Sequence, residues 1–121
     1  MEQEKNHYLD KKLFVSLLEI LEPIIENKDR SKEDIKLINN KLNEFYLEID
    51  KKQLITKYIQ IVGEDIFNKL KVSSLESFFE ILPGVLKASS LYINKTNDYL
   101  YLIAQLTIMT DWFLYKSIDI N

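Results

Sequence analysis

The sequence predicts an all-α protein, a single-domain irregular bundle of five to six mostly antiparallel helices. Apolar residues recur at the three- and four-residue spacing of a helix along most of the chain. Only 2 Gly and 2 Pro occur, which is too few for the tight turns of an all-β fold. A length of 121 residues gives room for one domain, 1–121, with one hydrophobic core.

The first helix is expected to begin near Leu9 or Asp10 and to reach about Asn27. Its apolar stripe consists of Leu13, Leu17, Leu21 and Ile24. Pro23 conflicts with this pattern because proline removes a helical hydrogen bond and clashes with the preceding turn. We therefore expect a kink or a break at Pro23. Residues 1–9 are expected to form a mobile arm.

Two helices with clear end signals follow. Ser31 is expected to cap a helix whose buried stripe is Ile35, Ile38, Leu42, Phe45 and Ile49. Asp50 is the expected cap of a third helix, and Gly63 its expected end. Residues 64–71 form a short amphipathic segment.

The C-terminal half begins with a serine cap, at Ser73 or Ser74. The helix after it is expected to be kinked or broken at Pro83-Gly84. Asn97 or Asp98 is expected to cap a last helix that reaches about Ser117, followed by a frayed tail at residues 118–121.

The last helix carries two apolar stripes instead of one. The first is Leu102, Leu106, Met109 and Phe113, and the second is Tyr101, Ala104, Ile108, Trp112 and Tyr115. A helix with two stripes packs on two sides, so it either lies at the centre of the bundle or presents its second stripe to a partner. The predicted core consists of Leu17, Leu21, Ile38, Phe45, Ile61, Phe78, Leu82, Leu86, Leu102, Leu106 and Phe113.

Composition argues against an enzyme. The chain has no Cys and a single His, His7, which disfavours thiolate sites, most histidine metal sites and a Ser-His-Asp triad. Gly63 and Gly84 each stand alone, whereas a phosphate-binding loop needs several glycines close together. We expect no catalytic residues, no cofactor and no metal.

Residues 99–115 are the most apolar stretch, but they contain Asp111 and are short for a membrane span. We expect a buried helix there and no membrane span. The N-terminal residues are charged and show no secretory signal, so a cytoplasmic location is expected.

Carboxylates gather along the first helix and the start of the second. The members expected to bind a partner are Glu19, Glu22, Glu26, Asp29 and Glu33. An acidic helical face can occupy a basic cleft on another protein, which speeds encounter and blocks the cleft. Immunity proteins and antitoxins that inhibit nucleases work on this principle, and the size, acidity and helical composition resemble that general type. The expected function is therefore a non-catalytic protein-binding protein, most sharply an inhibitor of a toxin.

Two other functions remain open. Lys51, Lys52 and Lys57 with Tyr58 offer a small basic patch for a subunit of a nucleic-acid complex, although a net charge of -3 makes nucleic acid an unfavoured partner. The second stripe of the last helix, with Tyr101, Ile108, Trp112 and Tyr115, could instead join two copies of the chain. Tyr92, Tyr99 and Tyr101 are candidates for the lining of a cavity.

Overall fold

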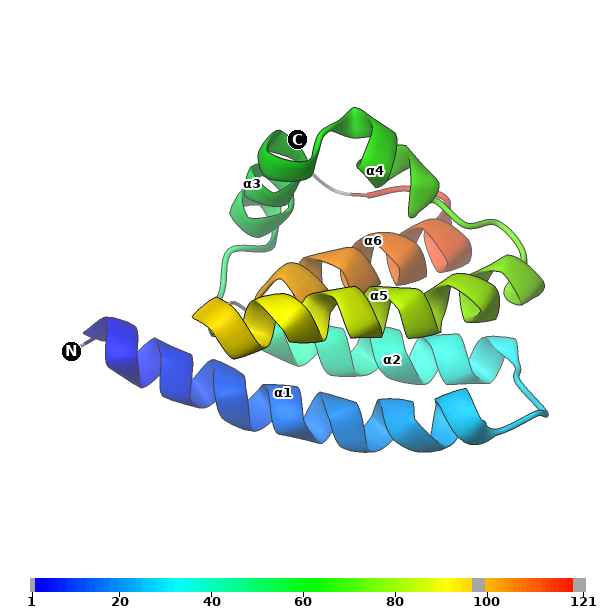
Figure 1. The fold of residues 1–121 in the computed structure, drawn as a ribbon, viewed down its shortest axis with the longest axis horizontal. Helices are drawn as coiled ribbons and strands as arrows, with labels where there is room; N and C mark the ends of the chain where they lie inside the picture. The colour runs from blue at the N-terminus through cyan, green and yellow to red at the C-terminus, as the bar shows by residue number, and fades with distance from the viewer. Residues whose placement is uncertain (1, 97–99, 119–121) are drawn as a thin grey trace.

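Six helices and no strand make up the residues described in the computed structural model (Figure 1). The backbone is described for residues 2–96 and 100–118, and the side chains for residues 12–87 and 100–118. The helices are α1 (Glu2–Glu26), α2 (Lys32–Phe45), α3 (Lys51–Val62), α4 (Glu64–Lys69), α5 (Leu75–Thr96) and α6 (Leu100–Tyr115). The predicted all-α bundle is confirmed.

Helices α1, α2, α5 and α6 lie side by side, and the α3–α4 pair covers α6 from the remaining side (Figure 1). α6 contacts α2, α3 and α5, so it is the helix around which the others pack. Its residues from Leu102 to Asp111 are buried with the exception of Gln105. This central position explains why the sequence of α6 has two apolar stripes.

Both prolines lie inside continuous helices. α1 runs through Pro23 to Glu26, and α5 runs through Pro83 and Gly84 to Thr96. Of the two outcomes expected at these sites, a break does not occur. Both prolines are exposed. Each proline therefore lies on the outer side of its helix, away from the side that packs in the core.

The helix caps predicted at Ser31 and Asp50 and the helix end predicted at Gly63 are confirmed, but α2 ends at Phe45, so Ile49 lies beyond it and is half-buried. The Ser31 N–H donates to Oδ2 of Asp34 at 2.9 Å, and Oδ1 of Asp50 accepts from the Gln53 N–H at 3.1 Å. Gly63 ends α3 at φ 89°, a backbone conformation that a side chain disfavours.

Other boundaries differ from the expectation or were left open by it. α1 begins at Glu2, well before the expected start near Leu9, so residues of the expected arm are helical, and its mobility stays a prediction. Ser74 caps α5, since its Oγ accepts from the Ser77 N–H at 3.1 Å. The expected caps at 97–98 and the tail at 119–121 lie outside the described residues.

Most of the predicted core is confirmed. The fully or nearly fully buried members are Leu17, Leu21, Ile38, Phe45, Phe78, Leu82, Leu102 and Leu106. Leu86 and Phe113 are half-buried at the edge of the core. Ile61 was predicted wrongly, because 62% of it is exposed. α3 rests on α6 through Ile55 and Tyr58, and Ile61 lies outside that contact.

Leu106 provides a test of the central position of α6. We expect Leu106→Ala to lower the free energy of unfolding by about 2–5 kcal/mol, because a fully buried side chain leaves a cavity among helices on several sides. Urea unfolding followed by circular dichroism measures this loss. The matched control Ile61→Ala removes an exposed aliphatic side chain and should change stability by less than about 0.5 kcal/mol. Equal losses in the two variants would contradict the central packing of α6.

Candidate functional site

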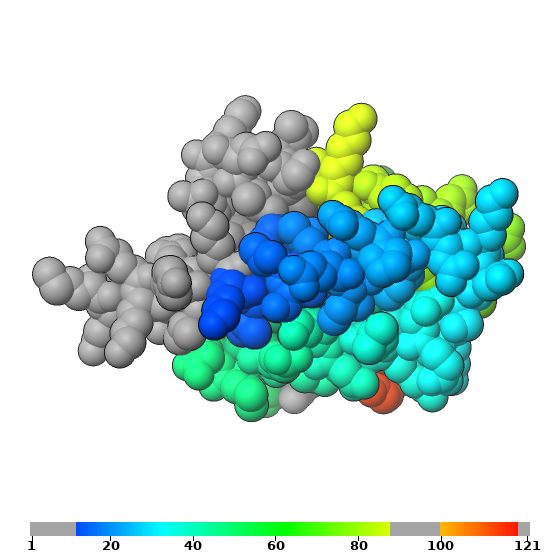
Figure 2. All heavy atoms as spheres, turned by 90° about the horizontal axis from the view of Figure 1, so that it is seen from below, coloured from blue at the N-terminus to red at the C-terminus, as the bar shows by residue number. Residues whose placement is uncertain are grey.

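The predicted carboxylates of α1 lie on its outer side. Glu19, Glu22 and Glu26 are exposed, whereas the opposite side of the same turns buries Leu17 and Leu21 against the core. The three- and four-residue spacing of the glutamates places them one above another on one helix face. Figure 2 shows that α1, from residue 12 onward, and α2 run along one side of the molecule.

In the turn between α1 and α2, Arg30 is directed inward, whereas Lys28 and Asp29 are exposed. Arg30 donates from Nη2 to the Ile25 carbonyl at 2.8 Å and from Nε to the Asn27 carbonyl at 3.1 Å. Its guanidinium lies 5.3 Å from the ring centroid of Phe79 on α5. Asp29, one residue earlier, is exposed. Arg30 thus closes the C-terminal end of α1, and the carboxylate of Asp29 faces solvent.

The start of α2 continues the acidic surface. Glu33 is exposed and forms only a solvent-exposed ion pair with Lys36, at 3.4 Å, which holds neither side chain firmly. Lys28 and Lys32 are also exposed and reduce the negative charge. We call the set Glu19, Glu22, Glu26, Asp29 and Glu33 the acidic hairpin surface. The structure brings all five onto the helical hairpin formed by α1 and α2.

The second stripe of α6 does not form one exposed face. Ile108 is fully buried, which corrects its expected place in a partner-binding surface. Tyr101 is half-buried and its ring packs edge-to-face on Tyr58 at 5.9 Å. Trp112 is half-buried under the ammonium of Lys71, 4.9 Å from the ring centroid. Only Tyr115 of the four predicted residues is exposed, because α6 is surrounded along its middle.

The lysine patch considered for nucleic acid is divided between interior and surface. Lys51 is ion-paired with Asp111, its Nζ 2.7 Å from Oδ2, and Tyr58 is buried. Lys52 and Lys57 are exposed on α3. Two of the four predicted residues are therefore part of the packing between helices and do not present themselves to a nucleic acid.

A buried polar cluster that the sequence analysis did not assign joins α2, α3 and α6. Nδ2 of Asn39 donates to Oγ1 of Thr110 and to Oδ1 of Asp111, each at 2.9 Å. The second carboxylate oxygen of Asp111 receives the Lys51 ammonium. Asp111 has a side-chain exposure of only 7%, so these contacts replace nearly all of its hydration. The signal for this cluster was the presence of acid, amide and hydroxyl groups at core-facing positions.

Tyr46 extends the cluster toward the end of α2. Its hydroxyl lies 2.9 Å from Oγ1 of Thr107, which itself donates to the Ile103 carbonyl at 2.7 Å. A threonine hydroxyl has a single proton, so Tyr46 is the donor to Thr107. Burial raises the pKa of the Tyr46 phenol well above its ordinary value, and the negative charge of Asp111 adds to the effect. The cluster is thus built to hold one charged pair and a neutral phenol among apolar helices.

Nothing in the described side chains assembles a metal site: no three His, Cys, Asp or Glu groups lie close enough together to hold an ion. The side chain of His7 lies outside the described residues. Over the described residues, no helix is both long and apolar enough to cross a membrane. No protein family model, curated protein or solved structure matches the chain.

The ion pair of Lys51 and Asp111 can be tested by removing its cation. We expect Lys51→Met to lower the free energy of unfolding by about 1–3 kcal/mol, because the buried carboxylate of Asp111 loses its compensating charge. Lys32→Met is the matched control, since Lys32 is also the first residue of its helix but is exposed. Urea unfolding of both variants makes the comparison. A loss for Lys51→Met no greater than for Lys32→Met would contradict the assigned role.

The raised pKa of Tyr46 predicts that the free energy of unfolding falls at alkaline pH. A phenol whose pKa is raised by folding stabilises the protein fully below its ordinary pKa of about 10, and this contribution disappears as the pH rises toward the raised value. We expect the decline in unfolding free energy above pH of about 10 to be shallower in Tyr46→Phe than in the wild type. Tyr115→Phe, at an exposed tyrosine, should keep the wild-type decline. Parallel declines in the wild type and Tyr46→Phe would rule out this coupling.

Proposed function

We propose that the chain is a non-catalytic protein that binds a partner protein through the acidic hairpin surface. The observation that carries the proposal is the exposure of five carboxylates beside an arginine that is directed inward. All five carboxylates of the surface are exposed, while the guanidinium of Arg30 is committed to backbone carbonyls and to the ring of Phe79. A partner would therefore meet these carboxylates on the hairpin of α1 and α2, where the exposed Lys28 and Lys32 offset part of their charge.

The chemistry of this surface favours a partner with a basic cleft. Four of the five carboxylates are held on helices and need no loop ordering on binding, which lowers the entropic cost of association. Complementary charge raises the rate of encounter and disfavours partners of the same sign. Inhibition of a toxin whose active cleft is basic, as an immunity protein or antitoxin achieves, is the sharpest form of the proposal. A cytoplasmic location, which the lack of cysteine suits, belongs to the same proposal.

The two alternatives have weaker support. A nucleic-acid role would have to use Lys52 and Lys57 alone, since Lys51 and Tyr58 are engaged between helices. Self-association through α6 would have to use Tyr115 and the outer edges of Tyr101 and Trp112, because Ile108 is fully buried. Neither set has as many exposed residues as the five carboxylates of the acidic hairpin surface.

The experiment uses charge reversal on the exposed side of α1. We mix the purified chain with the product of the neighbouring gene and follow co-elution by size exclusion and association by surface plasmon resonance at two salt concentrations. The triple variant Glu19→Lys, Glu22→Lys, Glu26→Lys should slow association by at least about tenfold at low salt, because the steering charge is inverted.

The control is a second triple variant with the same change of net charge, placed outside the acidic hairpin surface. Glu44→Lys, Glu48→Lys and Glu64→Lys alter three exposed carboxylates that lie outside the acidic hairpin surface. This control should retain most of the association rate. A complex that the two triple variants weaken equally would disprove the assigned surface. Absence of any complex, together with no protection against a toxin encoded beside the chain, would remove the proposed function.

A further inference from the structure

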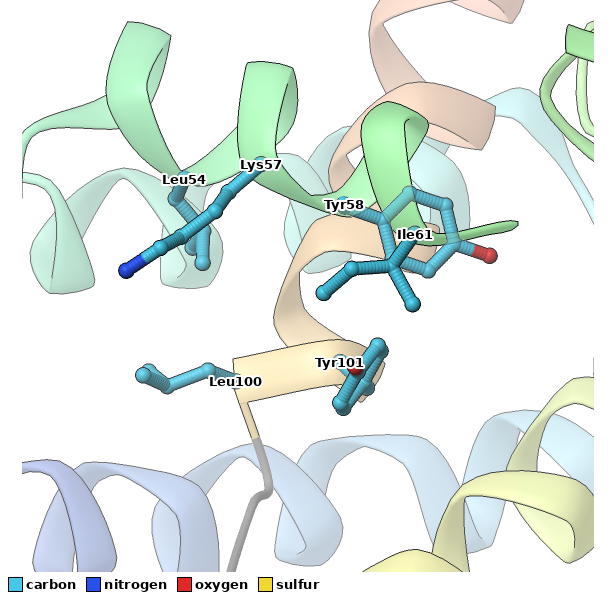
Figure 3. A pocket seen from close by; sticks show the side chains of 6 residues that line it. All are labelled: Leu54, Lys57, Tyr58, Ile61, Leu100 and Tyr101. Atoms are coloured by element: carbon cyan, nitrogen blue, oxygen red, sulfur yellow. The ribbon is translucent and has the colours of Figure 1, made fainter. Parts of the chain in front are cut away.

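A cavity lies between α3 and the first turn of α6, on elements that contribute nothing to the acidic hairpin surface. It has a volume of about 260 Å³ and is lined by Leu54, Lys57, Tyr58, Ile61, Leu100 and Tyr101. In Figure 3 the four side chains from α3 extend toward Leu100 and Tyr101 at the start of α6. Of the tyrosines suggested for a cavity, Tyr101 lines it, and the side chains of Tyr92 and Tyr99 lie outside the described residues.

The walls of the cavity suit an apolar body with a flat face. Leu54, Ile61 and Leu100 supply aliphatic surface, and the rings of Tyr58 and Tyr101 meet at an interplanar angle of 68°. Apolar cavities of about 150 Å³ in proteins bind benzene. A cavity of about 260 Å³ therefore has room for a body somewhat larger than a single ring, such as a bicyclic aromatic group.

The rim of the cavity adds one positive charge. Lys57 is exposed, and no described carboxylate lies within ion-pair distance of its Nζ. Figure 3 places this ammonium on the same side of the cavity as Leu54 and Leu100. Ile61 lies beside Tyr58 in Figure 3 and has 62% of its surface exposed, so a ligand that covered this side chain would remove apolar surface from water.

We propose that this cavity binds a small apolar carboxylate. The apolar body lies against Tyr58, Tyr101 and Ile61, and the carboxylate pairs with the ammonium of Lys57 at the rim. An isolated apolar molecule would satisfy the walls but leave the charge at the rim unused, which is why the assigned ligand carries an anionic group. This site is separate from the acidic hairpin surface, so a ligand here does not depend on the proposed protein partner.

The test titrates the full chain with 2-naphthoate and follows amide chemical shifts by NMR. Saturable binding with a dissociation constant of about 1 mM or lower is expected, since ligands gain roughly 0.3 kcal/mol or more per non-hydrogen atom. The shifts should centre on α3 and the first turn of α6. Neutral 2-naphthamide should bind about two- to fivefold more weakly, because it lacks the charge that pairs with Lys57.

Two variants at the rim and two matched controls complete the experiment. Ile61→Asp should weaken 2-naphthoate binding by at least about fivefold, since it replaces apolar wall by a like charge. Lys57→Gln should weaken it by about two- to fivefold and leave 2-naphthamide unchanged. The controls Ile66→Asp and Lys69→Gln change exposed residues of α4 that do not line the cavity, and they should bind as the wild type does.

The proposal fails on any of three results. Absence of saturable binding would show that the cavity takes no ligand of this class. Equal weakening by Ile61→Asp and Ile66→Asp would place the binding elsewhere on the chain. Equal affinity for 2-naphthoate and 2-naphthamide would remove the role of Lys57 in selecting an anion. Ile61 and Lys57 are both exposed, so neither substitution threatens the fold on which the comparison depends.

Discussion

The contact of Asp111 with Asn39 and Lys51 is the constraint on which the arrangement of the helices depends. α6 is apolar on nearly all sides, and apolar contacts alone would accept several rotations and translations of such a helix. A buried carboxylate removes that freedom, because it must meet its hydrogen-bond donor and its cation or suffer a large loss of solvation. Only one register of α6 places Asp111 between Asn39 of α2 and Lys51 of α3.

The same constraint determines what reaches the surface. Three half-buried cations are held by neighbouring elements: Lys51 by Asp111, Arg30 by the end of α1 and Phe79, and Lys71 by the rings of Phe67 and Trp112. These three cations thus serve contacts between elements, whereas the carboxylates of the acidic hairpin surface serve no such contact. This division is the physical basis for the proposed partner. Carboxylates that make no contact between helices remain available to bind a basic surface on another protein.

The two proposed sites use different parts of the bundle. The acidic hairpin surface belongs to α1, α2 and the turn between them, and the two helices pack against each other. The cavity belongs to the place where α3 leaves the bundle, because a helix that rests on α6 through Ile55 and Tyr58 leaves Ile61 and Lys57 beyond the contact. Protein binding and ligand binding are therefore separable by substitution.

Local patterns in the sequence determined the helices and most of their ends. Ser31, Asp50 and Gly63 act through hydrogen bonds or backbone conformation within a few residues, so their roles could be read without knowledge of the fold. The buried stripe of α2 and the exposure of the acidic hairpin surface follow from helical spacing for the same reason. Of the kink or break that the local rules allowed at Pro23 and Pro83, the break does not occur, because α1 and α5 continue through these residues.

Only the tertiary structure decided which apolar residues are buried and which polar residues pair. Ile61 and Ile108 have the same side chain and both lie on helical stripes, yet the first is exposed and the second fully buried. The difference arises because α6 is enclosed by α2, α3 and α5, whereas α3 meets the bundle along one side. Asn39 and Asp111 are 72 positions apart, and no local pattern relates them. Their contact exists because packing brings α2 beside α6, where an unpaired carboxylate could not be buried.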